Sequence, residues 1–381
     1  MSKLEKLIKK LCPNGVEYKE LNTLVDYIQP TKYIVKSTKY NDEYDIPVLT
    51  PGQTFILGYT NEKEGIYNAD KENPIILFDD FTTAFRWINF KFKVKSSAVK
   101  ILIPKNNNIN FRYIFYTMQT IKFDNTQHNR QWISKYSILK IPVPPIEVQN
   151  EIVRILDNFI ELATELEAEL EARKKQYEYY KDKILKFSKK DLNVEWINLG
   201  TYCNRLKGTA ITASKMKEIS ENDGNIKIFA GGKTVTKTSE KNIPKEDIIT
   251  VPNIIVQSRG IIDFIYYDKP CSFKREMWSY TTDNNITLKF IYYYLKNNVK
   301  YFRQRGSQMG SMPQISLDVT EKYKIPILPI EEQERIVSIL DKFDKLCNDI
   351  TQGLPVEIEA RRKQYEYYRD KLLNFKETKN G

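Results

Sequence analysis

Two segments of this chain each occur twice, and this internal repeat constrains the fold more than any other feature. Residues 140–159 (KIPVPPIEVQNEIVRILDNF) and 324–343 (KIPILPIEEQERIVSILDKF) are identical at 13 of 20 positions. Residues 171–187 (EARKKQYEYYKDKILKF) and 359–375 (EARRKQYEYYRDKLLNF) are identical at 13 of 17. We call 140–159 and 324–343 the opening blocks, and 171–187 and 359–375 the closing blocks. A repeat of this kind indicates one structural plan used twice. Each copy has a variable region followed by a closely repeated one.

The repeated regions have the spacing of long amphipathic helices. From Ile152 to Phe187, apolar residues recur at alternating steps of four and three, and only Arg173 interrupts the series. The second region has the same spacing but carries four extra residues near Gly353 and Pro355, where we expect the helix to be interrupted. We call this stripe of apolar residues along one helix face the apolar seam; a stripe with this period needs a partner helix. Two equivalent copies predict that the two helices pair as an antiparallel coiled coil about a pseudo-twofold axis.

The variable regions have the pattern of mixed α/β domains. Short β-rich runs are expected at 75–78, 99–103, 248–251 and 261–267, and amphipathic helices at 111–121 and 288–301. The expected class is therefore α+β: two mixed α/β domains in a pseudo-twofold repeat, joined by two long helices. The expected boundaries are an N-terminal segment at 1–20, a first variable domain at 21–145, a central helix at 146–187, a second variable domain at 188–329, a distal helix at 330–375 and a tail at 376–381.

The positive charge of the chain lies in the variable domains. The whole chain carries a formal charge of +11. Residues 21–145 hold 16 basic and 11 acidic groups, and residues 199–328 hold 20 and 12. The two helical regions are acidic, with 7 basic and 10 acidic groups in 146–187 and 8 and 10 in 330–375. Because the excess lies in the domains and not in the long helices, we expect each domain to bind a polyanion, with nucleic acid favoured.

Polar segments next to the expected helices and strands have the side chains that read DNA. Arg, Asn, Gln, Ser and Thr supply phosphate contacts and hydrogen bonds to base edges. An ordinary solvated loop is the alternative for any one of these residues. The candidate DNA-binding residues are Thr83, Arg86, Gln127, Asn129, Arg130, Ser258, Arg259, Lys274, Arg275, Arg303, Arg305, Gln308 and Ser311.

Several chemistries are disfavoured by composition. His128 is the only histidine, and Cys12, Cys203, Cys271 and Cys347 are far apart, so neither a multi-histidine metal site nor a zinc knuckle is expected. Asn73-Pro74 is followed by Ile75 rather than by a second proline and an aromatic residue, so the adenine-holding motif of amino-methyltransferases is missing. No phosphate-binding glycine loop is present. We expect no catalytic residue, no bound metal, no membrane span and no signal peptide, as in a cytoplasmic protein.

The repeated blocks resemble those of type I restriction-modification specificity subunits. The matching motifs are P-P-I-E-x-Q-x-x-I-V-x-I-L-D-x-F, its second copy P-I-E-E-Q-E-R-I-V-x-I-L-D-x-F, and E-A-R-[KR]-K-Q-Y-E-Y-Y-[KR]-D-K-[IL]-L. The opening LCPNGVEY at 11–18 is also similar, so the resemblance covers the whole chain. It implies that the variable domains are two target-recognition domains, each reading one half of a bipartite double-stranded DNA site, and that the helices set the gap between the halves.

The same resemblance implies partners and cofactors. Two modification subunits would use S-adenosylmethionine to methylate adenine, and restriction subunits would use ATP and magnesium to cleave DNA, while this chain binds no cofactor. Tyr179 and Tyr367 fall outside the apolar seam and are candidates for contact with the modification subunits; packing within the helices is the alternative. Two other functions stay open at this point: a self-contained DNA-modifying enzyme, and a structural coiled-coil protein with no DNA role.

Overall fold

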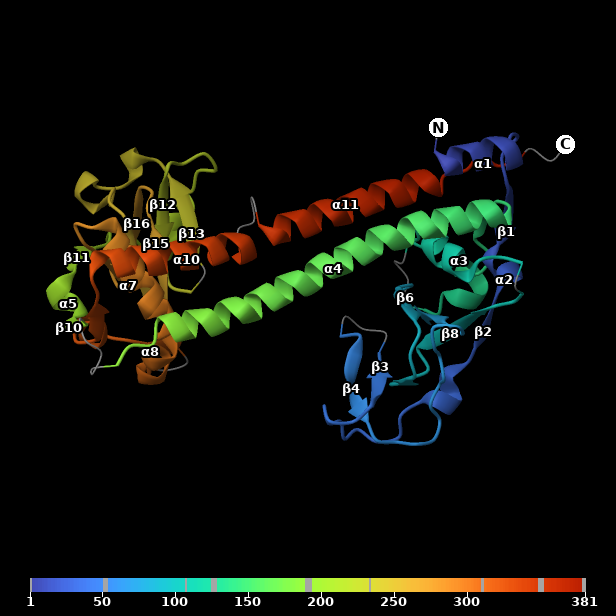
Figure 1. The fold of residues 1–381 in the computed structure, drawn as a ribbon, viewed down its shortest axis with the longest axis horizontal. Coiled ribbons are helices and arrows are strands. Elements are labelled where there is room, and N and C mark those ends of the chain that lie inside the picture. Colours follow the sequence, from blue (N-terminus) through green and yellow to red (C-terminus); the bar gives the residue numbers. More distant parts are fainter. Residues whose placement is uncertain are drawn as a thin grey trace. The chain divides into compact units, whose positions relative to one another are not determined.

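The chain folds into two compact units, and each one takes parts from both repeats (Figure 1). The computed structural model describes residues 2–50, 54–106, 108–124, 129–188, 194–232, 234–309, 312–348 and 353–378. Unit 1 comprises Met1–Glu165 and Ile358–Gly381, and unit 2 comprises Leu166–Glu357. Each unit therefore combines the variable region and opening block of one repeat with the closing block of the other.

Unit 1 contains three sheets. A four-stranded antiparallel sheet has the order β2-β8-β5-β6, a three-stranded sheet has the order β4-β3-β7, and β1 pairs with β9. β5 is central and buried along its whole length, which explains its unbroken apolar run. The strands are β1 (Glu17–Glu20), β2 (Val25–Ile28), β3 (Ile46–Leu49), β4 (Ile56–Thr60), β5 (Ile75–Asp79), β6 (Phe85–Ile88), β7 (Lys93–Val94), β8 (Val99–Pro104) and β9 (Lys140–Val143).

The helices of unit 1 pack the four-stranded sheet against the repeated blocks. The side chain of Asn110 caps α3 by accepting the N–H groups of Arg112 and Tyr113. Tyr113, Ile114 and Tyr116 of α3 share one buried core with Val148 and Ile152 of α4. The helices are α1 (Lys3–Leu11), α2 (Leu21–Leu24), η1 (Pro30–Tyr33), α3 (Phe111–Met118), η2 (Trp132–Tyr136), the first part of α4 (Ile146–Ile184) and most of α11 (Leu354–Leu372).

Unit 2 repeats the sheets of unit 1 with strands of different sequence. Its four-stranded sheet has the order β11-β17-β14-β15, its three-stranded sheet the order β13-β12-β16, and β10 pairs with β20. Strands β18 and β19 pair as a further two-stranded antiparallel sheet. The strands are β10 (Glu195–Asn198), β11 (Asn204–Lys207), β12 (Ile226–Phe229), β13 (Val235–Thr238), β14 (Asn253–Gln257), β15 (Asp263–Tyr267), β16 (Cys271–Phe273), β17 (Trp278–Thr281), β18 (Ser307–Met309), β19 (Met312–Gln314) and β20 (Lys324–Ile327).

The helices of unit 2 follow the same arrangement. Leu288, Phe290 and Ile291 of α7 share a core with residues of α10 and the second part of α4, so α7 has the place of α3. The helices are α5 (Leu199–Tyr202), α6 (Ala213–Glu218), η3 (Glu240–Asn242), η4 (Lys245–Asp247), α7 (Asn285–Asn297), α8 (Val299–Arg305), α9 (Leu317–Glu321) and α10 (Ile330–Asn348).

Two local expectations from the sequence are wrong. Residues 248–251 form no strand; only Ile249 makes an isolated bridge, to Cys271, and the neighbouring strand is β14. The apolar residues continue beyond Pro252, and the buried strand is formed by the residues after this proline rather than by those before it. The helix expected at 288–301 is two helices, because α7 ends at its C-cap Asn298 and α8 begins at Val299.

The apolar seam of the long helices is largely the less exposed side. Along α4, Ile152, Leu156 and Tyr177 are buried, whereas Tyr180, also a seam position, is 40% exposed. α4 is one helix of 39 residues. The second helical region is divided, since α10 ends at Asn348 and α11 begins at Leu354, with Pro355 in the first turn, where a missing N–H costs little.

Candidate nucleic-acid interface

Asp80 organises the polar edge of unit 1. It directly follows β5, and its side chain is buried. Its Oδ1 accepts the backbone N–H groups of Gln131 (3.2 Å) and Trp132 (2.8 Å). Its Oδ2 lies 3.4 Å from Nζ of Lys100, which is also buried. A buried charge is tolerated only when it is paired and hydrogen-bonded. Asp80 therefore fixes the segment before η2 against the end of the central strand.

The turn after Asp80 and the segment before η2 bring three candidate residues together. Arg130 is half-exposed; its Nη1 lies 3.5 Å from Oδ2 of Asp80 and donates to the carbonyl oxygen of Ser97 at 3.4 Å. Thr83 has a left-handed backbone, with φ of 59°, and its N–H donates to the carbonyl oxygen of Asp79. Asn129 is exposed, and its Oδ1 accepts from Nε2 of Gln131.

Arg86 lies on β6, beside the same turn. Its guanidinium stands 4.6 Å above the ring of Phe55, and together with Asp79 it lines a small hollow. The head group is therefore held near the surface by stacking rather than by an acid. We call Thr83, Arg86, Asn129 and Arg130 reading edge 1. Gln127, the fifth sequence candidate in this domain, lies outside the described residues.

Unit 2 builds an edge at the equivalent place with different chemistry. Ser258 follows β14 as Asp80 follows β5. The N–H of Ile315 donates to the carbonyl oxygen of Ser258 at 3.0 Å, as the N–H of Gln131 donates to that of Asp80 at 2.8 Å. The Ser258 hydroxyl donates to the carbonyl oxygen of Glu276, which joins the turn containing Lys274 and Arg275 to this strand end.

Other cationic candidates of unit 2 lie around this strand end. Arg259 is exposed and forms a β-bridge with Gln314 of β19. Nε of Arg303, on α8, donates to the carbonyl oxygen of Ile262 at 3.0 Å. The exposed guanidinium of Arg305 lies 4.5 Å from the ring of Tyr301. We call Ser258, Arg259, Lys274, Arg275, Arg303 and Arg305 reading edge 2.

Two further candidates of unit 2 have no described side chain. The backbone of Gln308 belongs to β18 and pairs with Pro313. Ser311 lies outside the described residues. Beside reading edge 2, Gly232 and Gly260 both have a left-handed φ that favours glycine, and the N–H of Gly232 donates to the carbonyl oxygen of Arg259 at 3.4 Å. A Cβ at Gly232 would meet no atom within 4 Å, so the backbone there is open to a close approach from outside.

Sequence reasoning missed the residues that hold reading edge 1 in place. Asp80 was not among the candidate residues, yet its buried carboxylate is structural and pairs with Lys100. The available signal was an acidic pair at the end of an apolar run, with Asp79 as the last residue of β5 and Asp80 directly after it. Lys100 gave none, because its partner is distant in sequence. Within the described part of the chain, no group of three or more His, Cys, Asp or Glu could hold a metal ion.

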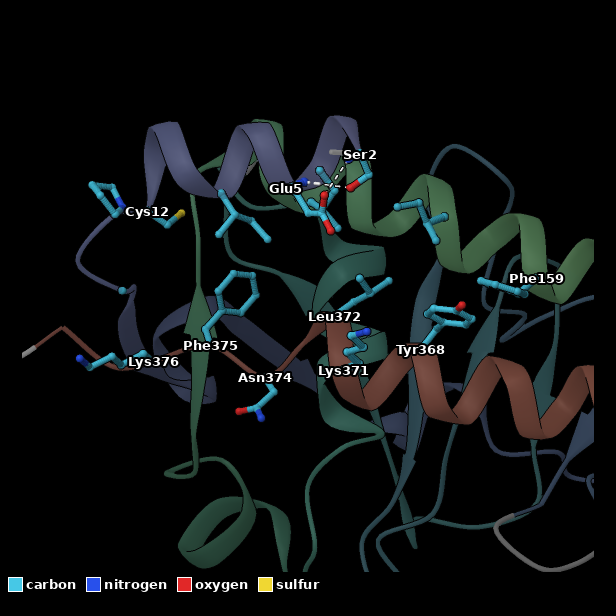
Figure 2. Close-up of a pocket in the computed structure, with 15 residues that line it drawn as sticks. Ser2, Glu5, Cys12, Phe159, Tyr368, Lys371, Leu372, Asn374, Phe375 and Lys376 are labelled. Atoms are coloured by element: carbon cyan, nitrogen blue, oxygen red, sulfur yellow. Dashed lines mark hydrogen bonds between the residues drawn. The ribbon is translucent and has the colours of Figure 1, made fainter.

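An apolar cavity of about 630 Å³ lies where the two ends of the chain meet in unit 1 (Figure 2). It lies among α1, α4, α11 and the segment after α11. In Figure 2, Phe159 and Tyr368 lie at one end, and Ser2 and Glu5 form the capping box of α1. The N–H of Val16 donates to the carbonyl oxygen of Lys376, so the end of the repeat is tied to the start of the chain.

The two tyrosines predicted to lie off the seam are on the surface. Tyr179 is 62% exposed and Tyr367 is 60% exposed. Each packs edge-on against the tyrosine that follows it, with ring centroids 5.3 Å apart in both cases. The two closing blocks thus present the same exposed aromatic pair.

Two equivalent mixed α/β units, each with a cationic polar edge after its central strand, define a DNA-recognition protein with two recognition domains. The comparisons with known proteins agree. A family model described as "Type I restriction modification DNA specificity domain" matches residues 13–176 and again 179–360. The chain therefore belongs to the type I restriction-modification DNA specificity family. It is a non-catalytic subunit of a restriction-modification complex.

Two relatives of this chain are described as type I restriction enzyme specificity subunits. The chain is 42% identical to the Escherichia coli type I restriction enzyme EcoR124I/EcoR124II specificity subunit, over 98% of this chain and 97% of that protein. It is 29% identical to a putative type I specificity subunit of Haemophilus influenzae, over 98% of each. Family membership favours neither of the alternative functions, the self-contained modifying enzyme and the structural coiled coil.

Solved structures share the fold. The type I restriction-modification S subunit from M. genitalium superposes with a TM-score of 0.61 at 17% identity, covering 95% of this chain and 97% of that one. A chain from a structure of type I complex assembly and conformational transition gives a TM-score of 0.55 at 15% identity, covering 95% and 98%. No helix among the described residues is long and apolar enough to cross a membrane.

Proposed function

We propose that unit 1 and unit 2 each read one half of a bipartite double-stranded DNA site, through reading edges 1 and 2. The observation that carries this proposal is the equivalent placement of the two edges. The carbonyl oxygens of Asp80 and Ser258 accept corresponding backbone N–H groups, yet the surrounding side chains differ. One scaffold with two differing edges suits two different half-sites, and Arg, Asn, Ser and Thr supply the readout.

The long helices set the gap between the two halves. α4 and the pair α10–α11 form an antiparallel coiled coil in this proposal. Its support is the burial along the apolar seam and the packing of each opening block against the other repeat's closing block. Phe159 stacks on Tyr368, and Phe343 stacks on Tyr180. Because these helices carry more acidic than basic groups, they repel the DNA phosphates, and contact with DNA falls to the domains.

Two modification subunits bind the chain, one near each closing block. The exposed Tyr179 and Tyr367 support this stoichiometry, because the same surface is presented twice. Exposed aromatic residues are favoured at protein interfaces. The modification subunits supply S-adenosylmethionine-dependent adenine methylation. Restriction subunits supply ATP- and magnesium-dependent cleavage. The complex works in the cytoplasm, and this chain holds no cofactor.

Sequencing of methylated adenines tests the proposal. A host lacking other adenine methyltransferases carries this chain together with its modification subunit, and a second host carries the modification subunit alone. The expected result is one two-part motif with a fixed gap, methylated only when this chain is present. Methylation without this chain, or a motif that is a single uninterrupted sequence, contradicts the proposal.

A further inference from the structure

Each unit contains the same small cluster around one carboxylate of its opening block. In unit 1, Asp157 of α4 accepts a hydrogen bond from Nε of Arg112, at 3.0 Å, and another from the hydroxyl of Tyr116. In unit 2, Asp341 of α10 accepts from Nζ of Lys289, at 2.7 Å, and from the hydroxyl of Tyr293. We call each set of three residues a carboxylate cluster. Asp157 and Asp341 occupy the same position of the repeat.

The cation of each carboxylate cluster also contacts an aromatic ring on the edge strand of the four-stranded sheet in the same unit. The guanidinium of Arg112 lies 4.6 Å from the ring of Trp87 on β6. The ammonium of Lys289 lies 5.5 Å from the ring of Tyr266 on β15. β6 and β15 are the edge strands at the same end of the two equivalent sheets. A cation above an aromatic ring is attracted by the ring's negative face. Each cluster therefore joins a long helix, a domain helix and a recognition strand.

The clusters preserve their chemistry although the residues differ. The cation and the tyrosine are four residues apart on α3 and on α7, which places them on one helix face. Arginine in unit 1 is replaced by lysine in unit 2, and the tryptophan by tyrosine. The domains have diverged over most of their length, so an arrangement retained in both serves a task that both share.

The carboxylate clusters are too exposed to contribute much to the stability of the unit in which each one lies. The side chain of Asp157 is 45% exposed and that of Asp341 is 35% exposed. The apolar cores already pack α3 and α7 against the long helices. Apolar contact has no preferred direction, whereas hydrogen bonds have strict geometry. Burial, and then the acceptor Asp157, raise the pKa of Tyr116, which keeps its hydroxyl protonated as a donor. The clusters thus supply orientation.

We infer that Asp157 and Asp341 are positioning residues: each fixes the angle between its recognition domain and the long helix that carries it. Gap discrimination then depends on both residues, because a domain that can rotate on its helix accepts half-sites at a neighbouring spacing. The inference rests on the proposed function, in which the helices set the gap. It adds that the joint between helix and domain, and not only the helix length, determines how strictly the gap is read.

The test measures adenine methylation by the complex of the full chain with its modification subunits. The DNA substrates carry the native gap or a gap one base pair longer or shorter. In Asp157→Asn and in Asp341→Asn, the ratio of methylation on the native gap to that on the altered gaps falls about tenfold, the effect of one lost charge-assisted hydrogen bond. Base discrimination within each half-site does not change. A purely structural role lowers thermal stability but leaves this ratio at the parent value.

Matched variants provide the controls. Glu161→Gln and Glu334→Gln remove exposed carboxylates from α4 and α10 that form no hydrogen bond or ion pair with any side chain among the described residues, and they keep the parent ratio. The double variant Arg112→Lys with Trp87→Tyr gives unit 1 the residues of unit 2, and it also keeps the ratio. If Asp157→Asn and Asp341→Asn keep the parent ratio, the inference is wrong and the proposed function stands. If the parent complex itself does not distinguish the gaps, the proposed function is what fails.

Discussion

Phe159 of the first opening block stacks on Tyr368 of the second closing block, with ring centroids 5.2 Å apart and an interplanar angle of 17°. In unit 2 the equivalent pair, Phe343 and Tyr180, has centroids 6.5 Å apart and an angle of 26°. Both contacts join the two repeats. The strong similarity of the repeated blocks therefore has a physical explanation: each opening block must fit the closing block of the other copy.

Removing the ring of Tyr368 should destabilise unit 1. Tyr368 lies against α4 beside the apolar cavity, so Tyr368→Ala enlarges a void and loses the stack. We expect a cost of about 2–4 kcal/mol in the free energy of unfolding. The control is Tyr367→Ala, at an exposed neighbour, which should change stability by less than about 0.5 kcal/mol. Urea unfolding measures both, and equal effects of the two substitutions would count against the assigned packing.

Acidic substitutions at the exposed tyrosines should release the modification subunits. Tyr179→Glu together with Tyr367→Glu places two charges on surfaces that we propose to be covered in the complex. A desolvated, unpaired charge at an interface is costly. Size-exclusion chromatography of the complex should show loss of assembly, with unchanged helix content by circular dichroism. Ile138→Glu and Val251→Glu, at exposed residues in loops, are the controls and should leave assembly intact. Assembly retained by the double tyrosine variant indicates that these rings serve the helices alone.

Glu151 should make the stability of unit 1 depend on pH in the acidic range. Hydrogen bonds from Arg154 and then Lys3 hold the pKa of the Glu151 carboxyl at about 2. The unfolded chain has a glutamate pKa of about 4.3, so the ionised form stabilises the folded state. This contribution is fully present above the unfolded value and is lost as pH falls towards 2.

The comparison of Glu151→Gln with the parent isolates that contribution. The difference in unfolding free energy should be about 1–2 kcal/mol at pH 7 and should shrink between pH 5 and pH 2, roughly the interval between the two pKa values. Glu147→Gln, at an exposed position of the same helix, should show no such trend. If the difference in unfolding free energy between Glu151→Gln and the parent does not change with pH, the ion pairs of Glu151 do not stabilise unit 1.

Arg305 should contribute more to DNA binding than Arg303. The Nε of Arg303 already donates to the carbonyl oxygen of Ile262, whereas the guanidinium of Arg305 is exposed and held beside Tyr301. If Arg305 reads a base edge of the second half-site, Arg305→Ala costs about 1–3 kcal/mol of binding free energy and relaxes specificity there. Lys175→Ala, on the acidic central helix, is the control. Unchanged binding and methylation after replacing Arg303, Arg305 and Gln308 together excludes this edge as a DNA contact.

The repeat and its helices could be predicted from sequence because their signal is periodic and doubled. The seam positions Ile152, Leu156 and Tyr177 are buried, as a heptad pattern requires. Tyr180 fits the same pattern yet is 40% exposed, and its ring stacks on Phe343 at a centroid distance of 6.5 Å, farther than the 5.8 Å of the buried Tyr177. The strand expected at 248–251 was placed too early, since an apolar run does not show where burial begins.

The supports of the candidate interface could not be predicted, because they join residues that are distant in the chain. Asp80 contacts Lys100 and the segment at 130–132, and Asp157 contacts Arg112, 45 residues away. Local pattern carries no information on such pairs. The cationic loops were visible as composition, while the carboxylates that position them become visible only in the fold.

The central claim is that the helices set the gap while each domain reads its own half-site. Deletion of Glu167–Leu170 from α4 tests it directly. Four helical residues correspond to about 6 Å of rise, or somewhat under two base pairs of DNA. The measurement is the methylated motif of a host that carries the deletion variant and the modification subunit. We predict a gap shorter by one or two base pairs with both half-sites preserved. An unchanged gap, or altered bases within either half-site, would contradict the account.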